Sequence, residues 1–279
     1  MKQLRGKVAV VTGAASGIGL ALCERFAAEG MALAMTDVEE SALAREVARL
    51  GSSGAEVLGV RCDVRDPASL EALRDASLHR FGAVHVICNN AGVAPAGPML
   101  DMRPDDWRWL VDVNLLGVAY GVGCFAPLLV EQGEGHIVNT ASEAGLVTSA
   151  MLGAYSASKH AVVGLSESLY RELEDTPVGV SVLCPNLVRT RIFESERNRS
   201  DGLDATPKQH ATLAPLRELI HGGIAPAAVA DHVVDAIRER RFWILTHSVT
   251  LDSALARFED LKAGRNPSDP YAGRRLPEG

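Results

Sequence analysis

A short apolar strand that runs directly into a glycine-rich turn and a helix constrains the fold of this 279-residue chain most strongly. Lys7–Val11 (KVAVV) has the Val-rich composition of a strand buried in a parallel sheet. The turn Thr12–Gly19 (TGAASGIG) follows, and Leu20–Ala27 has the composition and periodicity of a helix. Gly13 can take backbone angles closed to other residues, and the later glycines allow close approach of a ligand. This order predicts a diphosphate site at the helix N-terminus.

The second strand, Met31–Thr36 (MALAMT), ends at Asp37. A carboxylate at this strand tip, about 20 residues past the glycines, is placed to accept hydrogen bonds from an adenosine ribose. It would repel the 2′-phosphate of NADP, and no Arg or Lys lies in the glycine turn or directly after Asp37. We therefore expect a dinucleotide-binding fold that takes NAD, with NADP less favoured.

Tyr155 and Lys159 lie four residues apart in the segment YSASK, so on a helix they share one face. A tyrosine hydroxyl with its ordinary pKa of about 10 is a poor acid or base at neutral pH. A nearby cation favours the phenolate and lowers that pKa. The pair predicts a group that moves a proton on or off an alcohol oxygen, although such pairs on surface helices are more often simply solvated.

Alternating strand and helix patterns from Lys7 to about Leu245 predict an α/β fold with a doubly wound parallel sheet, the Rossmann fold. With 47% hydrophobic residues, the chain can bury one large core. We expect a single domain over residues 1–261 and a charged tail over 262–279. The segment 191–223 is polar, and we expect it to be irregular. The expected strands are Lys7–Val11, Met31–Thr36, Val57–Arg61, Val84–Cys88, His136–Thr140, Gly179–Leu183 and Phe242–Leu245.

Five ordered motifs make roughly residues 5–250 resemble the short-chain dehydrogenases/reductases. These motifs are Thr12-Gly-x-x-x-Gly-Ile-Gly19, Asn89-Asn90-Ala91-Gly92, Asn114, Ser142 and Tyr155-x-x-x-Lys159. The resemblance implies that Tyr155 exchanges a proton with the substrate oxygen, while Lys159 lowers its pKa and hydrogen-bonds the nicotinamide ribose. It also implies that Ser142 holds the substrate carbonyl and that Asn114 orders a water leading from the lysine towards solvent.

The same resemblance implies a set of cofactor contacts. Asp63 and Val64 correspond to an adenine-contacting pair, and Val188 and Thr190 to contacts with the carboxamide. The family usually has Pro-Gly where this chain has Pro185-Asn186; Asn tolerates left-handed backbone angles, so we expect the turn to form. The implied cofactor-binding residues are Gly13, Ser16, Gly17, Ile18, Gly19, Asp37, Asp63, Val64, Asn90, Ala91, Gly92, Tyr155, Lys159, Pro185, Val188 and Thr190.

In the family, the region that corresponds to 191–223 forms a substrate loop and lid; an irregular surface excursion is the alternative. Candidate walls of the substrate pocket are mostly small or apolar, which suits a hydrophobic or ring-containing alcohol such as a terpenoid, steroid or aryl carbinol. Glu143 is expected to face solvent rather than the pocket, since surface carboxylates are the norm. The candidate walls are Ala94, Ala96, Glu143, Leu152, Asn186, Leu187 and Ile192.

Composition excludes several classes of function. The five cysteines are scattered without a Cys-x-x-Cys pair, as expected for thiols in a reducing compartment, and the eight histidines suggest no metal site. A net charge of −7 argues against nucleic acid. We see no signal-peptide core and no apolar run of about 20 residues, so we expect no membrane span and a cytoplasmic location. The resemblance implies a homodimer or homotetramer built through the helices that carry Asn114 and Tyr155.

The favoured interpretation is an oxidoreductase that interconverts a secondary alcohol and a ketone with NAD(H). An NADPH-dependent reductase of 3-oxoacyl thioesters is an alternative, which Asp37 disfavours. A non-catalytic dinucleotide-binding regulator is a second alternative. Such relatives usually lose the tyrosine or the lysine, whereas Tyr155, Lys159, Ser142 and Asn114 are all present here.

Overall fold

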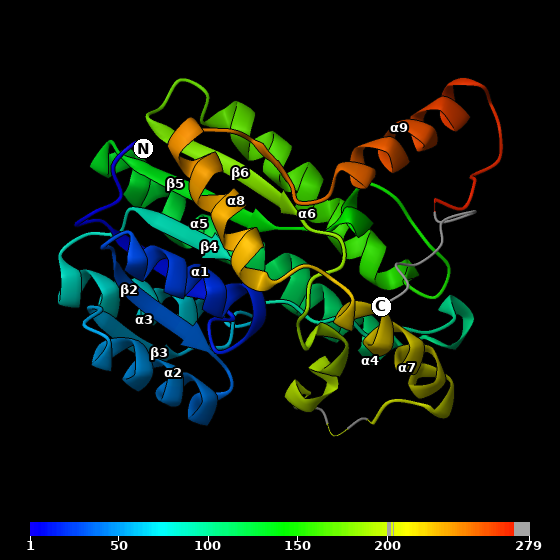
Figure 1. The fold of residues 1–279 in the computed structure, drawn as a ribbon, viewed down its shortest axis with the longest axis horizontal. Helices are drawn as coiled ribbons and strands as arrows, with labels where there is room; N and C mark the ends of the chain where they lie inside the picture. Colours follow the sequence, from blue (N-terminus) through cyan, green and yellow to red (C-terminus); the bar gives the residue numbers. More distant parts are fainter. Residues whose placement is uncertain (200–201, 203, 271–279) are drawn as a thin grey trace.

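The computed structural model describes residues 1–199, 202 and 204–270 (Figure 1). Within these residues, seven parallel strands form one sheet in the order β3-β2-β1-β4-β5-β6-β7. The expected doubly wound parallel sheet is confirmed, and each strand boundary lies within two residues of its expected position. The strands are β1 (Val8–Thr12), β2 (Ala32–Asp37), β3 (Val57–Arg61), β4 (Val86–Asn89), β5 (Gly135–Thr140), β6 (Val178–Cys184) and β7 (Trp243–Leu245).

The order of the strands reverses at β1, which pairs with β2 on one side and with β4 on the other. Chain connections leave in opposite directions from such a point, so a crevice opens at the carboxyl ends of the two strands. Ala9 is opposite Leu33 of β2 and Val86 of β4, which places Thr12 and Asn89 at the same edge of the sheet. The fold therefore puts the glycine turn at the crevice.

Helices cover both faces of the sheet (Figure 1). On one face α1 packs against α8, and Phe26 and Ile237 are fully buried there. On the other face α3 packs against α5, where Leu73 and Phe125 are fully buried. The helices are α1 (Gly17–Ala28), α2 (Glu40–Ser52), α3 (Pro67–Phe81), α4 (Pro104–Val111), α5 (Gly117–Gln132), α6 (Gly153–Glu172), α7 (Pro207–His221), α8 (Pro226–Glu239) and α9 (Ser248–Lys262).

A π-helical turn, Asp112–Leu116, joins α4 to α5 and makes one helix of Pro104–Gln132. Among the described residues this helix alone is long and apolar enough to cross a membrane. However, 44% of its most apolar window is buried inside the fold, and core helices of globular proteins meet the same criteria. We therefore interpret it as a core helix.

Most of the described residues of the segment 191–223 are helical, so the expectation of an irregular segment was wrong. A 3₁₀ helix, η4 (Ile192–Asn198), is followed by α7, which begins at a capping box. Thr206 Oγ1 accepts from the Gln209 N–H at 3.2 Å, and Gln209 Oε1 accepts from the Thr206 N–H at 2.7 Å. The charged residues of this segment do not mark an unpaired loop, because several of them pair with groups elsewhere in the fold.

The strongest of these pairings anchors η4 and α7 to α4 through the fully buried carboxylate of Asp106. Arg199 and Arg103 donate to its Oδ1 at 2.6 and 2.9 Å, and Gln209 donates to its Oδ2 at 3.2 Å. The Arg199 guanidinium also lies 4.9 Å from the centre of the Trp109 ring. Burial acts to raise the pKa of Asp106, but the two arginines lower it to about 2.

The C-terminal part follows the expected course only in outline. The last helix, α9, begins at Ser248 and ends at Lys262, the first residue of the expected tail. It extends away from the sheet (Figure 1). Residues 263–270 form neither helix nor strand, and the rest of the expected tail, 271–279, lies outside the described residues.

Two glycines of α5 allow a matched test of packing. A Cβ at Gly121 would lie 2.0 Å from Oδ1 of the buried Asn89, whereas a Cβ at Gly123 would meet nothing within 4 Å. Gly121→Ala is therefore expected to lower the free energy of unfolding by about 2 kcal/mol through overpacking. Gly123→Ala is expected to raise it by about 0.5–1 kcal/mol. Urea denaturation of both variants measures the difference, and equal effects would contradict the assigned packing.

Candidate active site

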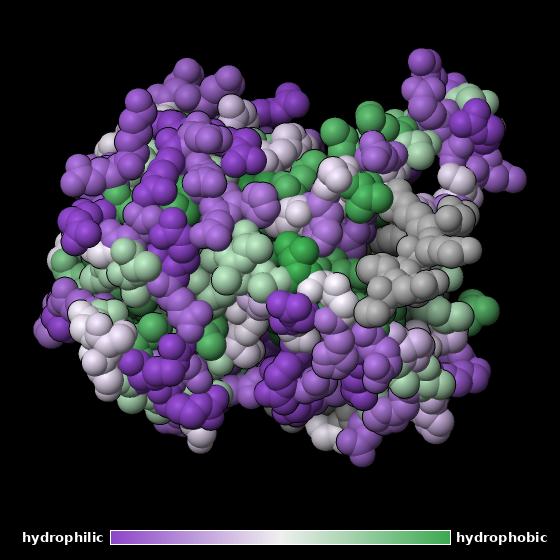
Figure 2. Space-filling model, viewed as in Figure 1, coloured by the Kyte–Doolittle hydropathy of each residue, from purple (hydrophilic) through white to green (hydrophobic). Residues whose placement is uncertain are grey.

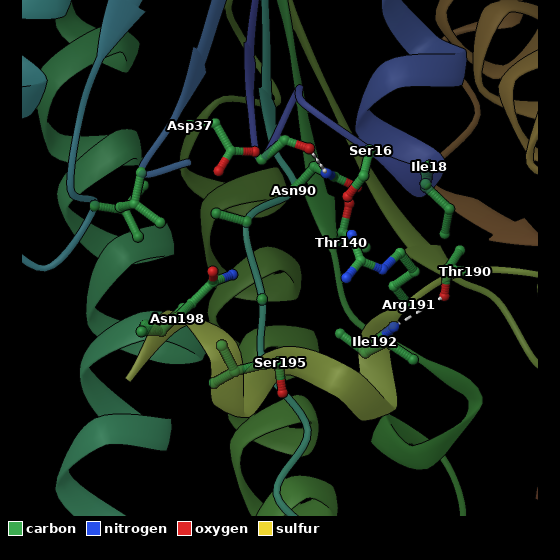
Figure 3. Close-up of a pocket in the computed structure, with 18 of the residues that line it drawn as sticks. Ser16, Ile18, Asp37, Asn90, Thr140, Thr190, Arg191, Ile192, Ser195 and Asn198 are labelled. Carbon is green, nitrogen blue, oxygen red and sulfur yellow. Dashed lines mark hydrogen bonds between the residues drawn. The ribbon is translucent and has the colours of Figure 1, made fainter. Parts of the chain in front are cut away.

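A groove runs along the carboxyl ends of the central strands, between the glycine turn and η4 (Figure 3). It contains most of the residues that the sequence singles out, including both ends of the Tyr155–Lys159 pair. Gly19 and Asn114 do not line it. The expected site residues that line the groove are Gly13, Ser16, Gly17, Ile18, Asp37, Asp63, Val64, Asn90, Ala91, Gly92, Ser142, Tyr155, Lys159, Pro185, Val188 and Thr190.

The glycine turn has the geometry that its sequence predicts. Gly13 and Gly17 have φ values of +66° and +55°, in the left-handed region that favours glycine. A Cβ at Gly19 would lie 2.1 Å from the Gly13 carbonyl oxygen, so only glycine fits there. The N-cap of α1, Ser16, makes no side-chain cap hydrogen bond. Gly17 and Ile18, the first two residues of α1, line the groove, so this helix N-terminus fits a diphosphate.

Thr12 joins the end of β1 to the loop that follows β4. Its Oγ1 donates to the Cys88 carbonyl oxygen at 3.4 Å and accepts from the N–H groups of Asn90 and Ala91 at 2.9 and 3.0 Å. Asn90 Nδ2 donates back to the Thr12 carbonyl oxygen at 2.9 Å and to the Gly13 carbonyl oxygen at 3.4 Å. These hydrogen bonds fix the floor of the groove. Thr12 supports this floor through its side chain and does not itself line the groove.

Asp37 lies at the end of the groove that the glycine turn and β2 form (Figure 3). Its Oδ2 accepts from the Ala15 N–H at 3.0 Å, and its Oδ1 accepts from the Glu39 N–H at 3.0 Å. Two backbone donors thus fix the orientation of the carboxylate. The glycine turn and the end of β2 are thereby held together, as a ribose-binding carboxylate requires.

Ser142 and Tyr155 meet at the opposite end of the groove. Ser142 follows β5 and caps a short 3₁₀ turn, where its Oγ accepts from the Ala144 N–H at 3.1 Å. The side chain of Tyr155, on the first turn of α6, lies close enough to Ser142 for the serine hydroxyl to act on the pKa of the phenol. One helical turn later, the buried Lys159 donates from Nζ to the Thr140 carbonyl oxygen at 2.8 Å. Three side chains from two elements thus converge on one end of the groove.

The electrostatics of this cluster differ from the expected lowering of the tyrosine pKa by the lysine. Burial raises the pKa of the Tyr155 hydroxyl, and the hydrogen bond from Ser142 opposes that rise. Burial also lowers the pKa of Lys159 to about 8, from an ordinary 10.5. Lys159 Nζ lies 5.8 Å from the centre of the Tyr155 ring and is directed at Thr140. Desolvation, rather than the lysine charge, dominates the tyrosine here.

Asn114 occupies the π-helical turn and is fully buried. Its Oδ1 accepts from the Val93 N–H at 2.8 Å, and its Nδ2 donates to the Val93 carbonyl oxygen at 2.9 Å and to Ser158 Oγ at 3.2 Å. Gly92 lies between Asn114 and Lys159. A Cβ at Gly92 would lie 3.4 Å from Asn114 Oδ1 and 3.6 Å from Lys159 Nζ. Asn114 therefore lies behind the groove, beside the lysine.

The candidate substrate walls divide into three groups. Asn186 and Ile192 line the groove, and Ala94, Ala96 and Leu152 belong to the apolar cluster that contains Tyr155. Leu187 belongs to neither set; its carbonyl oxygen accepts from the Ile224 N–H at 3.0 Å.

The expectation that Glu143 faces solvent was wrong. Glu143 is only 2% exposed, and its Oε1 accepts from Thr250 Oγ1 of α9 at 3.1 Å. It does not line the groove either. Glu143 is buried because it contacts α9, and its partner Thr250 is 107 residues away in the sequence.

Sequence reasoning missed the contribution of η4. Ser195, Arg197 and Asn198 line the groove, and Ser195 Oγ accepts from the Ala94 N–H at 3.0 Å (Figure 3). No local pattern marks these residues, since they reach the site only through the packing of η4 across the strand ends. Trp109 of α4 lines the groove as well.

Comparison with known proteins identifies the family. The sequence model of the short chain dehydrogenases matches residues 7–201, well over half of the chain. The chain belongs to the short-chain dehydrogenase/reductase family. The expectation of an NAD(P)-dependent dehydrogenase or reductase acting on a CH–OH group is confirmed at this level.

Three relatives of the short-chain dehydrogenase span nearly its whole length. It is 38% identical over 249 residues to 1-deoxy-11-beta-hydroxypentalenate dehydrogenase of Streptomyces avermitilis, covering 88% of this chain and 86% of the relative. It is 30% identical over 284 residues to the C alpha-dehydrogenase of a Sphingobium species, covering 100% and 93%. A short chain dehydrogenase/reductase from Burkholderia phymatum, solved in complex with NAD, is 46% identical, with a TM-score of 0.94 and coverage of 97% and 99%.

The lowered pKa of Lys159 predicts how stability depends on pH. Below pH 8 the folded protein holds a desolvated charge, whereas the unfolded chain keeps the same proton up to about pH 10.5. Lys159→Met removes this cost, so we expect the free energy of unfolding at pH 7 to rise by about 1–3 kcal/mol. The gain should shrink as the pH increases from 8 towards 10.5, because the wild-type lysine then loses its proton in the folded state.

Chemical denaturation at pH 7, 8.5 and 9.5 measures this effect. Lys262→Met is the matched control, because the Lys262 side chain is 79% exposed and carries no burial cost. A Lys159→Met variant that is less stable than wild type at pH 7, or whose gain does not change with pH, would contradict the assigned cause.

Proposed function

We propose that this short-chain dehydrogenase interconverts a secondary alcohol and a ketone with NAD(H), on a hydrophobic or ring-containing substrate. The observation that carries the proposal is the placement of Ser142, Tyr155 and Lys159 at one end of a groove whose other end holds Asp37 and the glycine turn. The groove joins a dinucleotide-binding end to an end suited to proton transfer. A non-catalytic regulator would need the dinucleotide-binding end but not the end suited to proton transfer.

The proposed roles of the residues follow from this arrangement. NAD, when bound, supplies the acceptor for the hydride. Tyr155 takes the alcohol proton, and Ser142 holds the substrate oxygen beside it. Lys159 hydrogen-bonds the nicotinamide ribose, and Asn114 orders a water beside the lysine. Because burial raises the pKa of Tyr155, oxidation of the alcohol should be faster at alkaline pH.

The proposed cofactor is NAD rather than NADP. The carboxylate of Asp37, fixed by two backbone N–H groups, suits ribose hydroxyls and would repel a 2′-phosphate. A structure 46% identical to this chain was solved with NAD. The same carboxylate disfavours the NADPH-dependent 3-oxoacyl thioester reductase, which remains the alternative. The proposed cofactor contacts are the groove residues named above, from Gly13 to Thr190, without Ser142 and together with Gly19.

The proposed substrate class follows from the apolar cluster beside Tyr155. Ala94, Ala96, Phe193, Leu213 and Ile220 are all buried there. Such a lining suits a carbocyclic or aryl alcohol, and one relative is named for a hydroxypentalenate. Residues 191–223 would form the lid over this pocket within a domain of residues 1–261, and 262–279 would form the tail.

We also propose that the enzyme is a cytoplasmic homodimer or homotetramer. Figure 2 shows hydrophobic surface where α9 leaves the body of the molecule, amid largely hydrophilic surroundings. Leu251, Leu255 and Phe258 of α9 are each more than half exposed and recur at helical spacing. Exposed apolar stripes of this kind typically mark contacts between subunits.

The test is NADH formation with a panel of secondary alcohols at neutral and alkaline pH, with NADP alongside. Tyr155→Phe is expected to lower kcat by about 10²–10⁴-fold while NADH binding is retained, because only the proton-transferring hydroxyl is lost. Activity that survives Tyr155→Phe would overturn the proton-transfer role. Activity with NADP alone would overturn the role of Asp37. Binding of NADH without turnover on any alcohol would favour the regulator.

A further inference from the structure

Two arginines reach the adenosine end of the groove, although neither lies in the glycine turn or directly after Asp37. Arg65 follows Asp63 and Val64, and Arg197 comes from η4. The 2′-phosphate of NADP is commonly bound by an arginine near this ribose. The rejection of that phosphate therefore cannot be explained by a lack of basic side chains.

Each of these arginines already has a carboxylate partner. Arg65 forms a bidentate pair with Asp63, with Nη2 2.6 Å from Oδ2 and Nε 3.0 Å from Oδ1. Arg197 pairs with Glu39: its Nη2 lies 2.7 Å and its Nε 2.9 Å from the same Oε1. Fork-like contacts between guanidinium and carboxylate occupy donors that would otherwise be directed at a phosphate.

The pair of Glu39 and Arg197 crosses the groove, because Glu39 follows β2 and Arg197 belongs to η4, 158 residues later. Both side chains are only about one-quarter exposed, at 26% and 25%. Arg197 Nη1 also donates to the Glu194 carbonyl oxygen at 2.9 Å, which fixes the guanidinium at the end of η4. The contact is thus partly desolvated and well oriented.

Glu39 and Asp37 are directly coupled, since the Glu39 N–H donates to Asp37 Oδ1. Burial acts to raise the pKa of Glu39, but hydrogen bonds from Arg197 and Asn198, with the nearby charge of Arg191, lower it below its ordinary value. Glu39 is therefore a carboxylate at neutral pH. Among the described residues that line this end, Glu39 pairs with Arg197 and Asp63 pairs with Arg65, while Arg191 of the groove wall pairs with Glu194. The charge of Asp37 is left over.

We propose that Glu39 determines cofactor selectivity by neutralising Arg197. The paired guanidinium cannot bind the 2′-phosphate of NADP, and Asp37 repels that phosphate as well. This inference rests on the proposed NAD-linked function and deepens it. Removing the Glu39 charge would leave the Arg197 guanidinium at the edge of the ribose site with unused donors. A 2′-phosphate brings nearly two negative charges and would take the place of the lost carboxylate.

Four variants separate this proposal from a general effect of charge. Glu39→Gln removes the carboxylate, Arg197→Met removes the cation and keeps an apolar stem of similar length, and the double variant removes both. Glu24→Gln makes the same change in net charge as Glu39→Gln. Its partner, Arg49, forms a surface pair with it, and neither residue lines the groove.

Dissociation constants of NADH and NADPH are measured by the fluorescence of the reduced cofactors, excited through Trp109 in the groove wall. Glu39→Gln is expected to improve NADPH binding relative to NADH by about tenfold, as one charge-assisted contact would. The improvement should be absent in the double variant, in Arg197→Met and in Glu24→Gln. A repeat at high salt should reduce it, because a partly exposed charge pair is screened.

The possible outcomes distinguish this inference from the proposed function. If the wild type binds NADH and Glu39→Gln leaves the NADPH to NADH ratio unchanged, the inference is overturned and the proposed function stands. A ratio that shifts equally in Glu24→Gln, or still shifts in the double variant, also overturns it. A wild type that binds neither cofactor overturns the proposed function, and the inference falls with it.

Discussion

The hydroxyl of Thr12 is the contact on which the site depends. One side chain links the end of β1 to the loop after β4, at the point where the order of strands reverses. Without it, the two strand ends would be joined by the sheet pairing that stops at Val11 and Cys88 and by the Asn90 side chain, which donates to the Thr12 and Gly13 carbonyl oxygens. The glycine turn leaves this junction from one strand, and Asn90 and Gly92 leave it from the other.

The far wall of the groove is held in a different way. Here a buried carboxylate, Asp106, collects two arginines and a glutamine and so fixes η4 and α7 against α4. A buried ion pair of this kind contributes little net stability, because desolvation offsets the attraction between its charges. It does specify one arrangement of the segment. η4 is therefore a fixed wall of the groove.

Local sequence patterns predicted the strands, the glycine turn and the carboxyl-end residues well, because each depends on residues that are close in the chain. Asp37 and Tyr155 reached the groove for that reason. Glu143, Arg197 and Asp106 did not follow from the sequence, since their partners lie roughly a hundred residues or more away. The prediction of an irregular segment over 191–223 failed for the same reason, because the contacts of its described residues are long-range. Its charges look like those of a solvated loop until their partners are known.

The π-helical turn at Asp112–Leu116 limits how the length of the helix Pro104–Gln132 can vary. A π turn is an α-helix carrying one additional residue, and such turns occur frequently at functional sites. Deleting one residue there would restore a regular helix and rotate α4 against α5 by about 100°. Asp106 and Asn114 could then no longer face the lid and Val93 together. Insertions and deletions are therefore expected to be excluded from this helix in related enzymes, while surface loops change length freely.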